Sequence, residues 1–242
     1  MAEHLFYNNI VALNAGRHAG LSLKDPDGDL GFAAQTHAVP LVGSEFYRAA
    51  CNYPILFAGS DEEPAPVALL GLAEGDNLFV DSHGQWRNGT YVPAFIRRYP
   101  FILARGEGED EDLTVCVDEE YGGLSYEEGE PLLDTEGQQT ERMQSIVQFL
   151  QEFLAESERT RQFANRLAEL DLLVRRDMQV TDAEGNNFLL RDFKVIDETK
   201  LDDLPRETVM EFYSNGFLGW IHAHLVARNQ LEQMAQIQGR SA

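Results

Sequence analysis

The clearest hydrophobic pattern in the chain is YVPAFIRRYPFILA, which covers residues 91–104. Pro93 suits the first turn of a helix, because its missing N–H would have no partner there. Phe95 and Tyr99 then fall on one helical face. Since a residue before proline is pushed out of the helical region, the helix should end before Pro100. The letters that follow, PFILA, are apolar on both faces and predict a covered strand.

An earlier segment repeats this order of features. Ser44 is a good cap for a helix in SEFYRAACN, and Tyr53-Pro54 ends that helix before the apolar run ILFAGS. Each unit continues with a turn and another strand. The pattern predicts two copies of helix, Tyr-Pro, strand and returning strand, joined in one antiparallel or mixed sheet. A chance likeness of two short segments is the alternative, and the residues leave both open.

From Thr140 onward the pattern becomes helical. Thr140 can cap a helix whose apolar stripe begins at Met143, with a bend at Ser157 or at the turn that follows it. A turn at residues 182–187 predicts a β-hairpin, and helices follow, the first of them ended at Gly216. We therefore predict an α+β fold, with a mixed, mostly antiparallel sheet and short helices followed by a helix–hairpin–helix C-terminal part.

The same patterns suggest two lobes. Residues 1–138 predict a mostly β lobe with the internal duplication, and residues 139–242 predict a helical lobe with a hairpin. No Pro- or Ser-rich linker separates them. One integrated domain is therefore expected.

The net charge limits the possible binding partners more than the overall composition does. The 242 residues include 19 Lys and Arg against 41 Asp and Glu, a net charge of −22. Such a surface repels phosphate backbones and anionic lipids, so nucleic-acid binding and membrane insertion are not expected. No signal peptide or long apolar span is visible, which favours the cytoplasm. Cys51 and Cys116 show no metal-ligand spacing, and we expect two buried thiols without a disulfide.

Motifs of known chemistry are missing from the chain. It has no glycine-rich phosphate loop, no nucleophile elbow and no zinc pattern, so the sequence identifies no catalytic residue, and we predict no metal or cofactor. His222 and His224 lie two positions apart on a predicted helix, so one should pack and the other face solvent. The turn at residues 25–29 carries three aspartates, but Thr36 stands where a calcium loop has its closing Glu, which indicates an acidic turn.

Two histidines and one arginine pair are the better candidates for binding. His37 and His83 lie in turns beside the apolar units, and turns often carry sites. Arg97-Arg98 is the most conspicuous basic pair, and successive helical residues face about 100° apart. One arginine can pair with a carboxylate while the other reaches solvent or an anion. The candidates for ligand or partner binding are His37, His83, Trp86, Tyr91, Arg97 and Arg98, although the aromatic residues could equally belong to the core.

The succession of segments resembles the SapC family of bacterial proteins. The resemblance rests on YVPAFIRRYPFILA preceded by Trp86 and Gly89, on LLRDFKVIDETKLDDLP, and on FLGWIHAHLVARNQL. The family is named after a protein associated with a bacterial surface layer. Its members tend to be found beside genes for TonB-dependent receptors, flavin-dependent tryptophan halogenases and cupin-like proteins. The family has no established catalytic residues that could be carried over to this sequence.

Three hypotheses follow. The first is an accessory or binding protein without an evident catalytic site, acting with a halogenase or a TonB-dependent uptake system. The second is an enzyme with a dispersed site of histidines and acids or a metal, and the third is a surface-layer component. The chain is expected to be a monomer, or a homodimer through the terminal helix with Trp220 on its apolar face.

Overall fold

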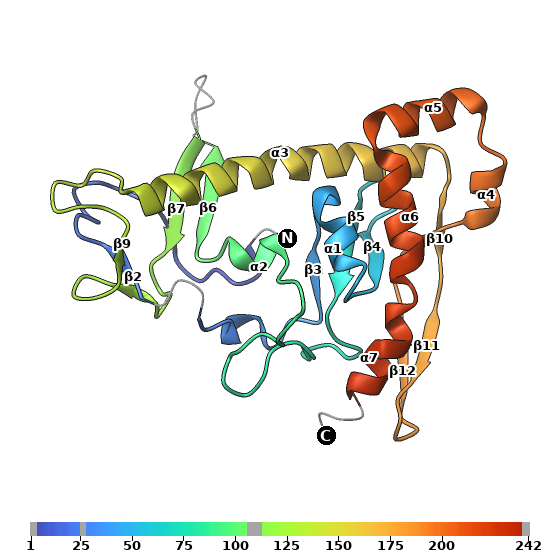
Figure 1. Cartoon of the computed structure of the whole chain (residues 1–242), viewed down its shortest axis with the longest axis horizontal. Coiled ribbons are helices and arrows are strands. Elements are labelled where there is room, and N and C mark those ends of the chain that lie inside the picture. The colour runs from blue at the N-terminus through green and yellow to red at the C-terminus, as the bar shows by residue number, and fades with distance from the viewer. Residues whose placement is uncertain (1–3, 25–27, 106–112, 239–242) are drawn as a thin grey trace.

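The longest element is helix α3 (Glu141–Glu169), which crosses most of the molecule in the computed structural model (Figure 1). At 1.5 Å per residue its 29 residues extend about 43 Å. Thr140 caps it as predicted, because its hydroxyl oxygen accepts a hydrogen bond from the Met143 N–H at 3.3 Å. The predicted bend at Ser157 is wrong. The Ser157 hydroxyl donates to the carbonyl of Phe153 at 2.7 Å, inside an unbroken helix.

The structure describes residues 4–24, 28–105 and 113–238, so residues 25 and 27 of the acidic turn lie outside it. The largest sheet has five antiparallel strands in the order β10-β13-β4-β5-β3. These strands are β3 (Ala38–Pro40), β4 (Ile55–Gly59), β5 (Pro64–Leu69), β10 (Leu173–Arg175) and β13 (Lys194–Ile196).

Smaller sheets complete the β structure. One has the order β1-β7-β6, another β8-β2-β9, and β11 pairs with β12 as a hairpin. Their strands are β1 (Ile10–Ala12), β2 (Ser22–Leu23), β6 (Phe101–Arg105), β7 (Leu113–Asp118), β8 (Leu124–Ser125), β9 (Glu130–Pro131), β11 (Met178–Thr181) and β12 (Asn187–Leu190). The α+β class with mostly antiparallel pairing is thus confirmed.

The two Tyr-Pro units do not share one sheet, which corrects the prediction. In the first, helix α1 (Phe46–Ala49) leads to β4 and the returning β5. In the second, helix α2 (Ala94–Arg97) leads to β6 and the returning β7. The outer edge of β7 is paired with the N-terminal strand β1, while β4 and β5 take β13 and β3 as neighbours. Partners from distant parts of the chain therefore separate the two units.

Four helices form the end of the chain beside the main sheet (Figure 1). They are α4 (Glu198–Asp202), α5 (Arg206–Asn215), α6 (Phe217–Ala227) and α7 (Gln230–Gln238). Gly216 ends α5 in the left-handed conformation, at φ 76°. On α6 His224 is buried and His222 is exposed, as predicted from their spacing.

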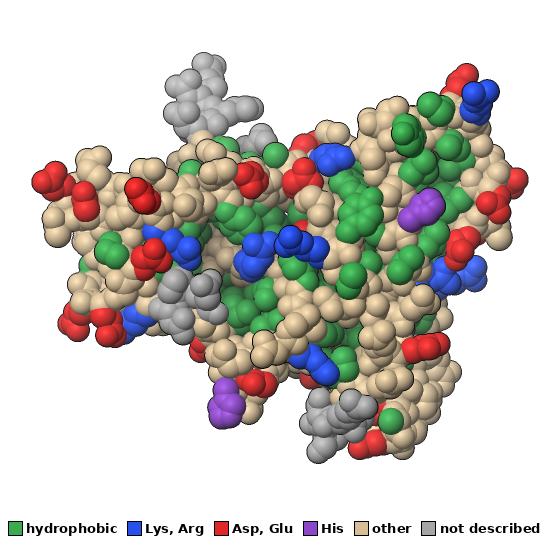
Figure 2. Space-filling model, viewed as in Figure 1, with side chains coloured by type: hydrophobic (Ala, Val, Ile, Leu, Met, Phe, Trp, Pro, Cys, Tyr) green, Lys and Arg blue, Asp and Glu red, His purple; other side chains and the backbone are tan. Residues whose placement is uncertain are grey.

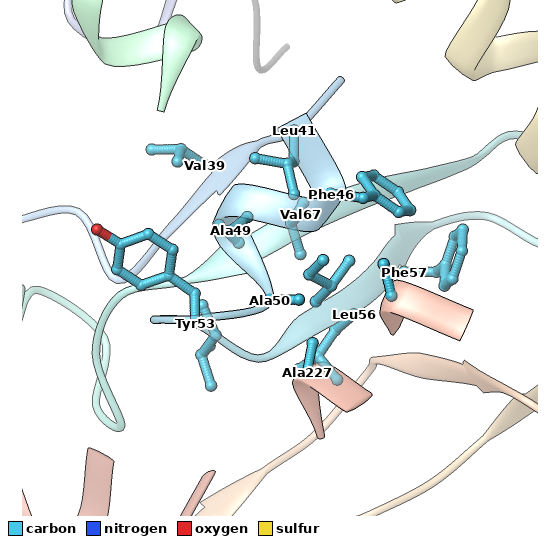
Figure 3. Packing of buried hydrophobic residues seen from close by; sticks show 14 of the residues in the cluster. Val39, Leu41, Phe46, Ala49, Ala50, Tyr53, Leu56, Phe57, Val67 and Ala227 are labelled. Atoms are coloured by element: carbon cyan, nitrogen blue, oxygen red, sulfur yellow. The ribbon is translucent and has the colours of Figure 1, made fainter. Parts of the chain in front are cut away.

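The apolar side chains form two cores, and α3 contributes to both. Helix α1 packs on β4 and β5 in the larger core, where Phe46 and Ala49 lie beside Leu56 (Figure 3). The C-terminal half of α3 adds Phe163, Ala164 and Leu167 to this core. Its N-terminal half adds Met143 and Leu150 to a smaller core around β2, β6 and β7. The middle of α3 therefore spans the region between the cores.

Two expectations about single residues are wrong. Trp220 is only 3% exposed, so it belongs to the core and not to an apolar outer face. It packs against Gly43, where an added Cβ would lie 2.4 Å from the indole ring. Cys51 is exposed, because it follows the short helix α1 on its outer side, whereas Cys116 is buried as expected. Both thiols are free.

Candidate functional site

Glu45 is a buried carboxylate that joins the starts of α1 and α2. One oxygen, Oε1, accepts hydrogen bonds from the Tyr91 hydroxyl at 2.7 Å and from the Ala94 N–H at 2.6 Å. The other, Oε2, accepts from the Val42 N–H at 3.2 Å. Burial raises the pKa of Glu45, against the opposing effect of these hydrogen bonds and of Arg97. The segment that carries Tyr91 is therefore fixed against α1.

Arg97 is held in place by that same segment. Its Nη2 donates to the Tyr91 hydroxyl oxygen at 3.0 Å, and its Nε donates to the carbonyl of Val92 at 3.0 Å. Burial and the nearby Glu45 raise the pKa of Tyr91 to about 12, so its phenol keeps its proton and donates a hydrogen bond to Glu45. A line of hydrogen bonds thus runs from the buried acid through the phenol to an exposed guanidinium.

A hollow of about 440 Å³, which we call the Arg97 hollow, lies beside the N-terminal third of α3, next to the smaller core. On the side of the molecule shown in Figure 2, basic side chains lie beside exposed apolar ones near the centre. Rings from distant segments line the hollow: Phe32, Tyr99, Tyr121 and, on α3, Phe149. The charged residues in its lining are Asp29, Arg97 and Arg142.

A second hollow of about 410 Å³ adjoins the first along α3. It shares Arg97 and Phe149 with the Arg97 hollow and is also lined by Glu45, Arg48 and Tyr91. The guanidinium carbons of Arg48 and Arg97 lie 5.8 and 5.7 Å from the centre of the Tyr91 ring. Arg97 also lies 5.0 Å from the ring centre of Phe149. Arg48 and Arg97 therefore lie against aromatic rings in the second hollow, which also contains the acids Glu45, Glu152 and Glu156. The Arg97 hollow has Asp29 as its one acid among the described lining residues, and it is the better place for an anion with an apolar group.

Two of the three arginines that line this groove lack an ion pair among the described residues. Among the described residues, neither Arg48 nor Arg97 forms an ion pair, and Arg142 reaches only Glu130, at 3.4 Å. By contrast, Arg166 pairs with two carboxylates elsewhere on α3. In a chain of net charge −22, arginines without carboxylate partners are available to an external anion.

The structure brings Tyr91 and Arg97 together and gives Trp86 a supporting position. The indole N–H of Trp86 donates to the Tyr53 hydroxyl at 3.3 Å, and that hydroxyl donates to the carbonyl of Tyr91. Trp86 also stacks on the buried Phe79, with ring centres 6.1 Å apart. It therefore orients the Tyr91 segment from behind and does not line the Arg97 hollow.

Arg98 points away from Arg97, as their positions on the helix require. It is 7% exposed, and its guanidinium carbon lies 4.2 Å from the ring centre of Phe95 and 5.0 Å from that of Phe153. It lines a separate apolar recess of about 270 Å³. Arg98 thus braces the interior, while Arg97 faces the hollow.

The two candidate histidines lie outside the Arg97 hollow. His83 is exposed in a turn closed by Asp81, whose Oδ1 accepts the His83 N–H at 2.8 Å. The carbonyl of His37 accepts the N–H groups of Leu70 and Gly71, at the edge of the main sheet. Among the described residues, no group of three or more His, Cys, Asp or Glu side chains is placed to hold a metal ion.

Sequence reasoning missed most residues of the groove, among them Asp29, Glu45, Arg48, Arg142 and Phe149. They come from distant parts of the chain and show no spacing of their own. One signal was available, because Phe149 and Phe153 lie four positions apart on α3 and off its main apolar stripe. Two large rings beside that stripe indicate a second contact face.

The structure is an α+β fold with an arginine- and aromatic-lined hollow between two cores. The chain belongs to the SapC family, whose model matches residues 13–234. No curated protein and no solved structure matches it. Across the described part of the chain, no helix combines the length and apolarity needed to cross a membrane.

Proposed function

We propose that this SapC-family protein is a binding protein that holds a small carboxylate with an apolar body in the Arg97 hollow. The observation that carries the proposal is Arg97, which forms no ion pair among the described residues and lies beside four aromatic rings in a strongly acidic chain. The volume of about 440 Å³ is in the range of small-molecule sites.

Arg97 is prepared for a carboxylate before a ligand arrives. Its hydrogen bonds to Tyr91 and Val92 fix the guanidinium plane, and its remaining N–H groups are available to an anion. A fixed guanidinium loses less entropy on binding and can contact both oxygens of a carboxylate. Phe149 on one side and the Tyr99 ring within the hollow supply apolar surface for the rest of the ligand.

The resemblance to the family adds a role for the bound ligand. We propose that the protein keeps it for a partner, for which a halogenase or a TonB-dependent uptake system is the candidate. No described group of side chains forms a recognised catalytic constellation around Arg97, which supports an accessory role over chemistry at this site.

Titration calorimetry with two matched probes tests the binding proposal. 3-Phenylpropanoate should bind, and the neutral 3-phenylpropanol should bind at least about tenfold more weakly, because a charged hydrogen bond is worth about 1.5–3 kcal/mol. Arg97→Ala should remove this difference. Arg206→Ala, an exposed arginine on α5 outside the groove, is the control and should bind as the wild type does. Equal binding of the two probes to the wild type would refute the proposal.

The accessory role needs a separate measurement. The protein should be isolated gently from its own cells and analysed by native mass spectrometry, beside the Arg97→Ala variant. A second chain that accompanies the wild type, together with a small bound mass that Arg97→Ala loses, would support it. A wild-type chain with neither would contradict the accessory role.

A further inference from the structure

The Arg97 hollow contains charges of both signs that do not neutralise each other. Asp29 lines it together with Arg97 and Arg142. Among the described residues, neither arginine is within ion-pairing distance of Asp29, since Arg97 forms no ion pair and Arg142 pairs with Glu130. An acid and two arginines therefore share one cavity with space between them. This arrangement matches a ligand that carries both charges.

Asp29 is held in position by its own turn. Its Oδ1 accepts the Gly31 N–H at 2.7 Å, and the Leu30 N–H donates to the carbonyl of Gly84 at 2.8 Å. Gly84 packs so closely that an added Cβ would lie 2.0 Å from Asp29 Oδ1. The second oxygen, Oδ2, has no hydrogen-bond partner among the described residues. One carboxylate oxygen is thus anchored, and the other is available to a donor.

The apolar part of the hollow is a continuous aromatic wall. The ring centres of Phe32 and Tyr99 are 4.4 Å apart, and those of Tyr99 and Tyr121 are 5.1 Å apart in an edge-to-face arrangement. Phe149 lines the hollow from α3, next to the guanidinium of Arg97. Rings in such contact favour a flat or bulky apolar group as their neighbour.

We infer that the ligand is an α-amino acid with an aromatic or large apolar side chain. Its carboxylate binds Arg97 with Arg142 nearby, its ammonium group donates to Asp29, and its side chain lies on the wall of Phe32, Tyr99 and Tyr121. The inference rests on the proposed carboxylate site and adds the ammonium group. An α-amino acid is the smallest common ligand that places both charges next to an apolar side chain.

Calorimetry with three probes of one skeleton separates the two proposals. L-Phenylalanine should bind the wild type about fivefold more tightly than 3-phenylpropanoate, as expected for one exposed ion pair. 2-Phenylethylamine, which lacks the carboxylate, should bind most weakly. In Asp29→Asn, which keeps an oxygen for the Gly31 N–H, phenylalanine and phenylpropanoate should bind equally. Asp177→Asn changes an exposed aspartate outside the hollow and should keep the wild-type preference.

Each outcome identifies which proposal fails. If phenylpropanoate binds and phenylalanine binds no more tightly, the ammonium site is refuted while the carboxylate site stands. If Asp29→Asn keeps the fivefold preference, Asp29 is not the ammonium partner and the inference is overturned. If phenylpropanoate does not bind at all, the proposed function itself fails. Tightest binding of phenylethylamine would overturn both.

Discussion

The buried imidazole of His224 should make the stability of the fold depend on pH. His224 is 0% exposed on α6, and its Nε2 accepts the N–H of Ile196 on β13 at 3.1 Å. This bond lies at the weakest junction of the main sheet, because β13 and β4 share the single register pair Lys194↔Phe57. His224 therefore accepts the Ile196 N–H, for which β4 supplies no register partner. Only the neutral ring can accept this hydrogen bond at Nε2.

The magnitude follows from the pKa of this ring. Burial lowers the pKa of His224 from 6.5 to about 4, and nearby Arg228 acts in the same direction while a backbone hydrogen bond at Ile55 opposes it. Between these pH values the unfolded chain holds a proton that the folded chain does not, so stability falls as the pH drops. The full loss is about 3 kcal/mol, and about 2 kcal/mol of it should be present at pH 5.0.

Urea unfolding followed by circular dichroism measures the effect. His224→Gln keeps an acceptor for the Ile196 N–H but cannot titrate, so it isolates the proton. The difference in unfolding free energy between wild type and His224→Gln should shift by about 2 kcal/mol from pH 7.5 to pH 5.0. This range stays above the sequence pI of about 4.5, where an acidic protein loses solubility.

A control and a refuting result complete the design. His222→Gln changes the exposed neighbour on the same helix and should alter stability by less than about 0.5 kcal/mol. If the difference between wild type and His224→Gln is the same at pH 7.5 and pH 5.0, the neutral buried imidazole does not contribute as argued.

Three further substitutions test two buried contacts of the fold and the Glu45 hydrogen bonds by thermal unfolding. Gly43→Ala should lower the free energy of unfolding by about 1–3 kcal/mol, because the added Cβ would meet the Trp220 ring. Gly122→Ala is the control and should be nearly neutral, since nothing lies within 4 Å of its added Cβ. Equal melting temperatures of the two variants would contradict the packing of Gly43 on Trp220. Lys194→Met should cost about 2–3 kcal/mol, since its buried ammonium donates to the carbonyls of residues 59 and 60; a cost no larger than that of the exposed Lys200→Met would refute this. Glu45→Leu leaves three donors without an acceptor and should lower the melting temperature by roughly 6–12 °C, and Glu45→Gln by less; similar values for both would argue against the hydrogen-bonded carboxylate.

Local signals in the sequence predicted the elements well where a single residue decides the backbone. Thr140 caps α3, Gly216 ends α5, and the apolar run after Pro100 is the strand β6. Each of these depends on the conformation or hydrogen bonding of a few neighbouring residues. Ser157 shows the limit of such signals, because its hydroxyl can bond within a helix as easily as disturb one.

The sheet arrangement depended on partners that no local signal identifies. The edge of β7 could accept any strand, and it accepts β1, about a hundred residues away in sequence, through pairs such as Val11↔Val117. The groove also depends on residues that come together from distant parts of the chain. Tyr91 and Arg97 were predicted candidates, but Glu45 and Arg142 join them only because the start of α1 and the N-terminal third of α3 lie next to α2.

The position of the Arg97 hollow follows from the length of α3. Met143 anchors one end of this helix in the smaller core, and Leu167 anchors the other in the larger core. Between these two residues, the ring centre of Phe149 lies 5.0 Å from the guanidinium carbon of Arg97. A straight helix fixed at both ends cannot bend to close this gap, so the space stays lined by side chains from both cores. An unbroken α3 is therefore a requirement of the proposed site, and the absence of a bend at Ser157 supports the proposed binding.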